Sequence, residues 1–390
     1  MARTGRAGVD IRIVEGFPDC INALSEGSAG APSFLRASWY EAAAPGQGWT
    51  IIASSGDKVL AAVPLAKAGP RLLPVSAVPG SYWPFRSILI DDDAGERELA
   101  SIFAHPRLRE AARPVWRLGP VYRCDPAIPR LKRAASQGGW TVLTRVLGRS
   151  FRLDLAGEQG AWPSKASAKR LRLYQRRLEA LGDVTCRIVA GRDWNGEVIA
   201  ALAAVEARSW VGTQTDRSGA KFLGDDAPAM WRRLTEDPVI SANLSAALLE
   251  CGGRPVAFSF DLRDGPIQYA LASSFDAEFA PYRVGRIVTH RQWQWAASQG
   301  VRTVDLGCGD SGYKSELGAR PGPEIVDLLL VQSRPLARLL ELGWGAESRI
   351  SREVFAQADP PPADGLRPYL QPAAWAATAA AAAMIAAGSE

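Results

Sequence analysis

Hydrophobic and polar positions follow their clearest pattern between Leu244 and Ala319. Three apolar runs stand close together in this stretch: LSAALLECGG, RPVAFSFDLR and PIQYALASSF. The junctions between the runs are Gly252-Gly253 and Asp264-Gly265, and such dipeptides tolerate the positive φ of a two-residue hairpin turn. The pattern therefore predicts three antiparallel strands in a meander.

A helix and a fourth strand follow the meander. The helix is predicted near Val284–Ser298, with Gly285 at its start and Gly300 just beyond its end. The run VRTVDL then predicts a strand, which a helical connection places parallel to the preceding strand. A polar loop from Gly307 to Lys314 follows at the carboxyl end of that strand, where open α/β sheets gather their functional residues.

The first part of the chain predicts a similar order of elements. Hairpin strands across Gly56-Asp57 are followed by further strand segments, a helix over 95–111, the strand VWRLG, the helix PRLKRAASQGG and the strand WTVLTRV. A separate strand, SFRLDL, opens the second part. Two hairpin strands followed by a helix and a strand thus occur twice, and we predict a degenerate duplication of one fold.

These patterns divide the chain into three segments. Residues 1–148 form a degenerate N-terminal half, residues 149–345 form a C-terminal half that carries the site, and residues 346–390 form an appendage rich in Pro and Ala. The C-terminal half contains a strongly charged predicted helix at 164–182, with a basic stripe of Lys165, Lys169, Arg172 and Arg176. A long polar loop after Trp210 is a candidate lid or acceptor-binding loop.

Composition limits the class of protein. The chain has 390 residues, 47% of them hydrophobic, which is enough for two domains with buried cores. The net charge is +5, and no uncharged apolar run of 18 residues or leader-like hydrophobic segment is present, so we expect a cytoplasmic protein without a membrane span. Five widely spaced cysteines and two histidines predict neither a disulfide framework nor a metal site.

The stretch from Gly252 to Ala319 resembles the GNAT superfamily of acyl-CoA-dependent N-acyltransferases. The shared positions are Phe275-Asp276, Tyr282 and Gly285 before the helix, and Gly309 with Tyr313-Lys314 after the strand. More narrowly, the chain is similar to the bacterial branch first noted beside cellulose-biosynthesis genes and related to Fem-type peptidoglycan ligases. In one departure, the glycine-rich pyrophosphate loop of the superfamily is reduced here to residues 282–286.

The resemblance implies an α/β fold with tandem GNAT-like halves, mixed sheets flanked by helices, and acyl-CoA, in the simplest case acetyl-CoA, as co-substrate. The start of a helix offers free N–H groups and partial positive charge, so Arg283, Gly285 and Arg286 are candidates to bind phosphates. Backbone N–H groups near Ser273 and Ser274 are expected to polarise the thioester carbonyl if the two parallel strands diverge.

The remaining candidate site residues concern proton transfer and the acceptor. By resemblance, Tyr313 is the acid that protonates the departing thiolate. Lys314 is predicted to bind substrate, and Glu206 to bind or deprotonate the amine. The predicted acceptor-binding residues are Trp210, Asp276 and Asp310. For most of these residues a structural role, in a turn, a core or a solvated surface, is the alternative.

A different route would use Cys308 as an acyl-carrying nucleophile beside His290. The favoured hypothesis is direct N-acyl transfer from acyl-CoA to a small amine or amino sugar, linked to polysaccharide or cell-envelope synthesis. The alternatives are an aminoacyl-tRNA-dependent Fem-type ligase, for which the basic helix would bind tRNA, and a non-catalytic scaffold in polysaccharide assembly. Nucleic acid is expected as a partner only in the ligase alternative.

Overall fold

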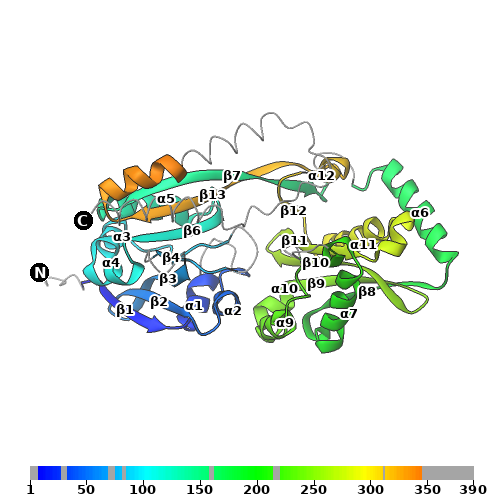
Figure 1. The fold of residues 1–390 in the computed structure, drawn as a ribbon, viewed down its shortest axis with the longest axis horizontal. Helices are drawn as coiled ribbons and strands as arrows, with labels where there is room; N and C mark the ends of the chain where they lie inside the picture. Colours follow the sequence, from blue (N-terminus) through cyan, green and yellow to red (C-terminus); the bar gives the residue numbers. More distant parts are fainter. Residues whose placement is uncertain are drawn as a thin grey trace, which may run out of the picture. The chain divides into compact units, whose positions relative to one another are not determined.

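The computed structural model describes residues 8–27, 33–68, 75–80, 85–157, 162–213, 220–310 and 312–344. It divides into two compact units (Figure 1). In the described part, unit 1 contains the residues up to Arg149 together with 323–344, and unit 2 contains Ser150–Gly322. Residues 323–344, which the sequence pattern assigned to the C-terminal half, thus pack in unit 1. The appendage expected at 346–390 lies outside the described residues.

Unit 1 combines short helices with a mixed sheet. Its strands are β1 (Asp10–Glu15), β2 (Gly48–Ser55), β3 (Lys58–Ala68), β4 (Val75–Ala77), β5 (Leu89–Ile90) and β6 (Val115–Tyr122). Its helices are α1 (Cys20–Glu26), α2 (Ala37–Ala43), α3 (Glu96–Ala104), α4 (Pro106–Ala112), α5 (Ala127–Gln137) and residues 334–344. Two long strands, β7 (Thr141–Asp154) and β13 (Arg320–Val331), contribute residues to both units.

Unit 2 contains the meander predicted from the sequence. Its strands are β8 (Val184–Ala190), β9 (Leu244–Cys251), β10 (Arg254–Asp264), β11 (Ile267–Phe275) and β12 (Thr303–Cys308). Its α-helices are α6 (Lys165–Glu179), α7 (Gly196–Ala207), α8 (Trp210–Thr213), α9 (Ala227–Glu236), α10 (Pro238–Asn243), α11 (Val284–Ser298) and α12 (Tyr313–Glu316). Two 3₁₀ segments, η1 (Gly191–Asp193) and η2 (Ala277–Tyr282), complete it.

The two units repeat one strand order. In unit 1 the order is β1-β2-β3-β4-β6-β13-β7, with antiparallel pairs up to β4 and a parallel pair between β4 and β6. In unit 2 the order is β8-β9-β10-β11-β12-β7, again antiparallel up to the parallel pair β11–β12. The predicted tandem of α/β halves is therefore confirmed at the level of topology.

Three local predictions were wrong. The segments WTVLTRV and SFRLDL form the single strand β7, because nothing between them supplies a turn and Gly148 continues the extended backbone. The helix expected over 95–111 is divided into α3 and α4 at His105-Pro106, where the proline ring cannot follow an uninterrupted helix. The loop expected up to Lys314 ends earlier, because a helical turn, α12, begins at Tyr313.

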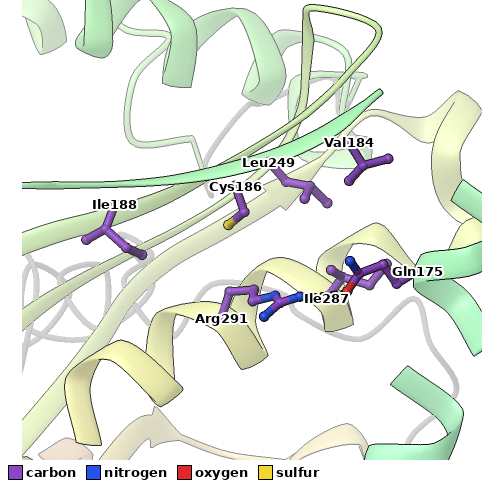
Figure 2. Close-up of a pocket in the computed structure, with 7 residues that line it drawn as sticks. All are labelled: Gln175, Val184, Cys186, Ile188, Leu249, Ile287 and Arg291. Carbon is purple, nitrogen blue, oxygen red and sulfur yellow. Dashed lines mark hydrogen bonds between the residues drawn. The ribbon is translucent and has the colours of Figure 1, made fainter. Parts of the chain in front are cut away.

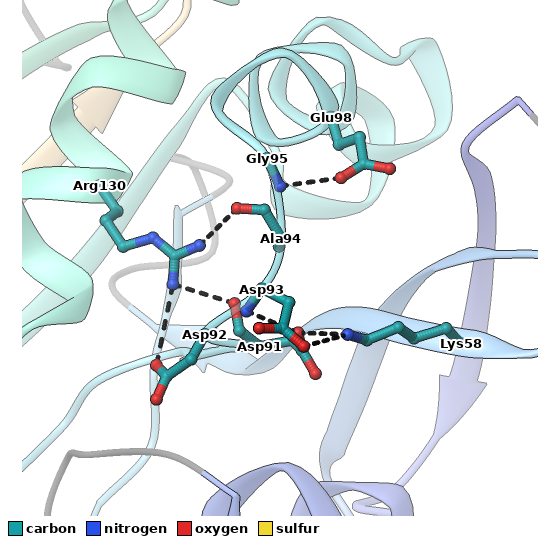
Figure 3. Close-up of polar contacts among 8 residues, drawn as sticks. All are labelled: Lys58, Asp91, Asp92, Asp93, Ala94, Gly95, Glu98 and Arg130. Atoms are coloured by element: carbon teal, nitrogen blue, oxygen red, sulfur yellow. Dashed lines mark hydrogen bonds and ion pairs between the residues drawn. The ribbon is translucent and has the colours of Figure 1, made fainter. Parts of the chain in front are cut away.

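In unit 1, an acidic run at 91–93 fixes the connection between β5 and α3 (Figure 3). Lys58 Nζ lies 2.9 Å from the carboxylate of Asp91. Arg130 donates hydrogen bonds to the carbonyl oxygens of Asp91 and Ala94, at 2.9 and 2.6 Å. The run thus joins β3 and α5 to the start of α3, which is a structural role for these charges.

The sheet of unit 2 is covered by helices on both faces. On one face, Phe222 and Trp231 pack edge-on against Phe258 and Phe260 of β10. On the other face α11 packs on β9 and β10, in a cluster that includes Val256, Ala257, Ile287 and Val288, among other buried residues. This packing places the first turn of α11 beside the carboxyl end of β11.

A carboxyl group is buried in unit 2. Asp261 of β10 is completely buried, and its Oδ1 accepts a hydrogen bond from Ser259 Oγ at 3.3 Å. Burial raises the pKa of Asp261 to about 7, and interactions with Gln268, Ser259 and Trp293 offset only part of that effect. The folded protein therefore binds a proton at Asp261 between about pH 4 and pH 7, where the unfolded chain does not.

We expect Asp261→Asn to change how stability depends on pH. Because the pKa of Asp261 is raised in the folded state, its contribution to the free energy of unfolding falls as pH rises through this window and is level above it. The variant should therefore gain at least about 1 kcal/mol relative to the native chain between pH 5 and pH 8. Urea denaturation of both proteins at each pH measures the difference between their free energies of unfolding. The titration of His290, which acts in the opposite direction, is common to both proteins and cancels in this difference. Parallel pH curves would contradict the prediction.

Candidate active site

The two parallel strands of unit 2 diverge along their length. β11 and β12 pair only at Ile267–Thr303, Gln268–Val304 and Tyr269–Asp305, although β11 continues to Phe275 and β12 to Cys308. From residue 270 onward, β11 therefore has no partner among the described strands on the side that faces β12. The predicted polarisation of a thioester carbonyl near Ser273 and Ser274 required the two strands to diverge, and they do. The divergence leaves a strand edge able to pair with an extended ligand.

Buried polar contacts of Asp305 hold the departing strand. Asp305 is completely buried, and its Oδ2 pairs with Arg152 Nε of β7 at 2.9 Å. Its Oδ1 accepts a hydrogen bond from Gly307 N at 3.0 Å. The pairing of β12 with β7 is irregular between Asp305 and Cys308. These contacts direct the end of β12 toward β7 and away from β11.

Helix α11 begins beside the unpaired edge with free N–H groups. Its N-cap, Arg283, adopts a left-handed conformation (φ 56°, ψ 36°) and supplies no side-chain cap. Arg286 N and Ile287 N both donate to Arg283 O, whereas no described residue accepts a hydrogen bond from Val284 N or Gly285 N. Two backbone donors and the positive end of the helix dipole are thus available to an anion.

Gly285 allows the helix to approach the strand closely. A Cβ atom at this position would lie 3.0 Å from Cδ1 of Phe275, the last residue of β11. The ring of Phe275 therefore rests on the first turn of α11. Gly285 is a phosphate-binding candidate by its position in the sequence, and its packing against Phe275 is a second role.

The two arginines at the helix start differ in their surroundings. Arg286 pairs with Glu316 of α12, which neutralises its charge and joins the first turn of α11 to α12. Arg283 is exposed, and no described carboxylate pairs with it. Of the two, Arg283 is therefore the cation that remains available to a phosphate.

Tyr313 lies on α12 and is positioned by Asp310. The Oδ1 atom of Asp310 accepts hydrogen bonds from Gly312 N and Lys314 N at 2.8 and 3.0 Å, and its Oδ2 accepts one from Ser315 N at 3.1 Å. Burial alone would raise the pKa of Asp310, but these hydrogen bonds lower it below its usual value. Asp310 is thus a carboxylate that stabilises the start of α12.

The phenol of Tyr313 remains protonated at neutral pH. The side chain is 48% exposed, and partial burial together with the charge of Asp310 raises its pKa to about 12. A protonated phenol at the start of α12 has the correct form for a general acid. Because Glu316 stands one turn after Tyr313 and pairs with Arg286, the phenol belongs to the same region as the start of α11.

Lys314 points into the protein. It is 5% exposed, and its Nζ donates hydrogen bonds to the carbonyl oxygens of Gly307 and Cys308, both at 3.0 Å. Burial lowers its pKa to about 8, although Cys308, Asp305 and Asp310 act in the opposite direction. The ammonium therefore ties α12 to the end of β12, a role that the sequence analysis did not assign to it.

Asp276 joins four elements at the end of β11. It is 1% exposed, and its Oδ2 pairs with Arg208 Nε at 2.6 Å and with Arg254 Nη2. Its Oδ1 accepts a hydrogen bond from Glu278 N at 3.1 Å, which caps η2. The ends of α7 and β11, the start of β10, and η2 all meet at this carboxylate. The sequence predicted Asp276 as an acceptor-binding residue, whereas these contacts make it a structural junction.

Glu206 and Trp210 lie near that junction. Glu206 is 1% exposed, and its carboxylate accepts hydrogen bonds from Lys221 N and Phe222 N. It therefore fixes the described end of the long loop whose residues 214–219 lie outside the described part. Trp210 is 47% exposed and stands two residues after Arg208, which pairs with Asp276. That position keeps Trp210 available as an acceptor wall.

The other candidates are distributed as follows. On β11, Ser273 is exposed and Ser274 is buried, so their side chains lie on opposite faces of the strand. The ring of His290 packs on Trp162 at 5.0 Å, and within the described residues no hydrogen bond joins it to Cys308. The acyl-cysteine alternative therefore has no supporting contact.

Two pockets lie elsewhere in unit 2. The first has a volume of about 260 Å³ between β8, α6 and α11 (Figure 2), and its lining residues are Gln175, Val184, Cys186, Ile188, Leu249, Ile287 and Arg291. The second, of about 300 Å³, is lined by residues that include Arg263, Gln268 and Trp295. None of the predicted site residues lines either pocket.

No group of three or more His, Cys, Asp or Glu side chains in the described ranges is placed to hold a metal ion. In the same part of the chain, no helix is long and apolar enough to cross a membrane.

Sequence reasoning missed the partners that shape the site. Arg208, Arg254 and Arg152 are scattered over more than 100 residues of sequence, yet they neutralise the buried carboxylates of Asp276 and Asp305. One signal was present, because an aspartate inside the apolar run VRTVDL needs a buried partner. Nothing in the sequence indicated which arginine supplies it.

Comparison with known proteins agrees with this architecture. A family model described as an acetyltransferase (GNAT) domain matches residues 165–315, which extend from α6 to α12. No curated protein matches the sequence. The L-PGS structure from Bacillus licheniformis aligns with a TM-score of 0.52 and 15% identity, over 87% of this chain and 98% of that one.

Two further solved structures are similar to the chain. The structure of FemX aligns with a TM-score of 0.52 and 12% identity, over 85% of this chain and all of that one. A tandem GNAT protein from the clavulanic acid biosynthesis pathway aligns with a TM-score of 0.44 and 14% identity, over 83% of this chain and 99% of that one. The first two alignments show a shared fold, and the domain match shows that residues 165–315 are similar to a GNAT domain.

Proposed function

We propose that the protein transfers an acyl group from acyl-CoA to the amine of a small molecule or amino sugar, at the divergence of β11 and β12. The observation that carries this proposal is the early end of β11–β12 pairing beside the uncapped start of α11. An extended amide chain and a diphosphate group are the two chemical parts that such a pair of features accommodates. Both parts are present in coenzyme A.

The free edge of β11 would bind the pantetheine arm. Its backbone groups from residue 270 onward lack a partner in β12, and the arm carries amides that can replace the missing strand. The N–H groups near Ser273 and Ser274 would then face the thioester carbonyl and polarise it. This binding would exclude water from the strand edge and fix the direction of the acyl group.

The start of α11 would hold the diphosphate. Val284 N and Gly285 N would donate to it, and Arg283, which pairs with no described carboxylate, would supply a positive charge. Arg286 is neutralised by Glu316 and contributes less, although the sequence alone ranks the two arginines equally. Together these groups would compensate for the shortened glycine-rich loop.

Acyl-CoA would supply a thioester, at whose carbonyl carbon a C–N bond forms while the C–S bond breaks. Tyr313 would hold the proton that the departing sulfur takes, and it would regain one from the acylated nitrogen through solvent. Trp210 would provide an apolar wall for the acceptor. Glu206, Asp276, Asp310 and Lys314 would act by positioning the elements around these groups.

Calorimetric titration with acetyl-CoA and with a longer acyl-CoA tests the proposal directly. Saturable binding in the micromolar range is expected for at least one of the two. If neither ligand binds, the acyl-CoA reaction is excluded as the function of this site.

We expect Arg283→Ala to weaken acyl-CoA binding about tenfold, because a charge-assisted hydrogen bond to phosphate is lost. Arg286→Ala should have a smaller effect, since Glu316 already neutralises that side chain. Arg192→Ala removes another exposed cation of unit 2 and serves as the matched control. Equal losses in all three variants would indicate a nonspecific charge effect and would contradict the assignment.

The second candidate function is aminoacyl transfer from tRNA by a Fem-type ligase. In that reaction the tRNA would bind on the exposed basic face of α6, which carries six cations. Loss of activity after ribonuclease treatment of a cell extract would identify this reaction. Activity that needs acyl-CoA and resists ribonuclease would exclude it.

A further inference from the structure

Helix α6 is attached to unit 2 by one narrow face. Leu178 is completely buried, and Tyr174 packs beside it against the cluster formed by Val284, Ile287 and Val288 of α11. Gln175 accepts a hydrogen bond from Arg291 of α11 at 2.7 Å, and both residues line the pocket drawn in Figure 2. These contacts fix the rotation of α6, so the opposite face is held toward solvent.

The outward face carries charge without compensation. Its six cations are all exposed: Lys165, Lys169, Arg170, Arg172, Arg176 and Arg177. No carboxylate in the described ranges pairs with any of them, although other exposed arginines, such as Arg123 with Glu324, do form ion pairs. Like charges three and four positions apart destabilise a helix, so this face lacks the support that charged helices usually have.

An exposed leucine stands in the middle of these cations. Leu173 is 40% exposed, and its neighbours one turn away on the helix are Lys169, Arg170, Arg176 and Arg177. Leu181, just after the helix, is 50% exposed. The outer face therefore combines a positive border with one apolar side chain, Leu173, at its centre.

From this face we infer that α6 docks the protein on a membrane surface that contains anionic phospholipids. The cations would lie at the level of the head groups, and Leu173 would enter the boundary with the acyl chains. A basic helix with a small apolar centre binds in the plane of the surface and does not cross it. The inference does not depend on the proposed acyltransfer reaction.

The composition of the face favours lipid over RNA. RNA-binding surfaces commonly add aromatic side chains on which bases stack, and the aromatic residue of α6, Tyr174, faces inward against α11. An exposed leucine gains nothing from a phosphate backbone, whereas it gains free energy in the apolar part of a bilayer. Leu173 therefore distinguishes the two partners.

Sedimentation of the full chain with vesicles tests the inference. The vesicles contain phosphatidylcholine alone or an equimolar mixture with phosphatidylglycerol. We expect binding to the mixed vesicles only, and weaker binding as salt increases. Arg172→Gln/Arg176→Gln should lower the partition coefficient about 25-fold, at about fivefold for each cation. Arg232→Gln/Arg233→Gln, the same change on α9, should leave it unchanged.

A third variant separates lipid from RNA. Leu173→Ala should weaken binding to the mixed vesicles several-fold. The affinity of the protein for total tRNA, measured by fluorescence anisotropy, should be the same with and without this substitution. Absence of vesicle binding would overturn the inference, as would equal losses in the α6 and α9 variants. Binding of tRNA together with vesicle binding that is insensitive to Leu173→Ala would also overturn it and would assign α6 to a nucleic acid.

Discussion

Replacing Tyr313 by phenylalanine is expected to lower kcat for acyl transfer about 100-fold, with little change in the affinity for acyl-CoA. The phenol has a pKa raised to about 12 and is therefore protonated when the sulfur departs. Without it, the thiolate must leave unprotonated or take its proton from water, and a positioned acid typically contributes a factor of about 10² to 10⁴. Steady-state kinetics with free-thiol detection measure the change.

Two controls accompany this variant. Tyr174→Phe removes the hydroxyl of another tyrosine of unit 2, on α6, and should keep full activity. Because Tyr313 is about half exposed, its replacement should not change the midpoint of thermal unfolding. A Tyr313→Phe variant with native kcat would remove the residue from the reaction. A variant with unchanged kcat and raised KM would indicate a binding role instead.

Replacing Asp276 by alanine is expected to lower the free energy of unfolding by about 3 kcal/mol. The carboxylate is 1% exposed and is shared by Arg208 and Arg254. Its removal leaves Arg208 without a carboxylate partner and leaves Arg254 with only the exposed Glu278. The loss also removes the cap of η2. The two arginines are partly exposed, so water can solvate them when the carboxylate is absent. The expected loss of unfolding free energy therefore lies at the lower end of the range for removing one partner of a buried ion pair. Urea denaturation measures it.

The structural role of Asp276 has a second consequence for the site. η2 connects β11 to α11, so its loosening should displace Arg283 and the free N–H groups and weaken acyl-CoA binding. Asp276→Asn, which keeps an acceptor for Glu278 N but loses the charge, should give an intermediate loss of stability. Asp183→Ala removes an exposed carboxylate of the same unit and should change stability by less than about 0.5 kcal/mol. Equal stability of the Asp276→Ala and Asp183→Ala variants would contradict the junction.

Local signals in the sequence predicted the central elements well. Gly252-Gly253 and Asp264-Gly265 form the two hairpin turns, and all these glycines have positive φ. The helix predicted over Val284–Ser298 is α11, with the same bounds. The parallel pairing of β11 with β12 follows from the handedness and length of a helical connection. Such features depend on a few neighbouring residues, and sequence patterns report them directly.

The hydrogen-bond partners of the polar side chains could not be predicted in the same way. Lys314 was expected to reach a substrate, but it turns inward because the carbonyl groups of Gly307 and Cys308 at the end of β12 lie within reach of its ammonium. Glu206 was a candidate to bind the amine, yet the loop at Lys221 returns to its carboxylate. In each case the partner is distant in sequence or belongs to a loop whose path the pattern does not specify.

By itself, the sequence determined the repeated α/β order, the meander, helix α11 and the region that contains the candidate site, because hydrophobic periodicity and turn residues act over short distances. The tertiary structure alone decided the point at which β11 and β12 separate. That point lies just after Asp305, which is the last residue of β12 to pair with β11 and whose side chain pairs with Arg152 of β7. The tertiary structure also decided that Glu316 neutralises Arg286, whereas no described carboxylate neutralises Arg283. Ion pairing depends on which side chains meet in space, and the sequence pattern does not specify this.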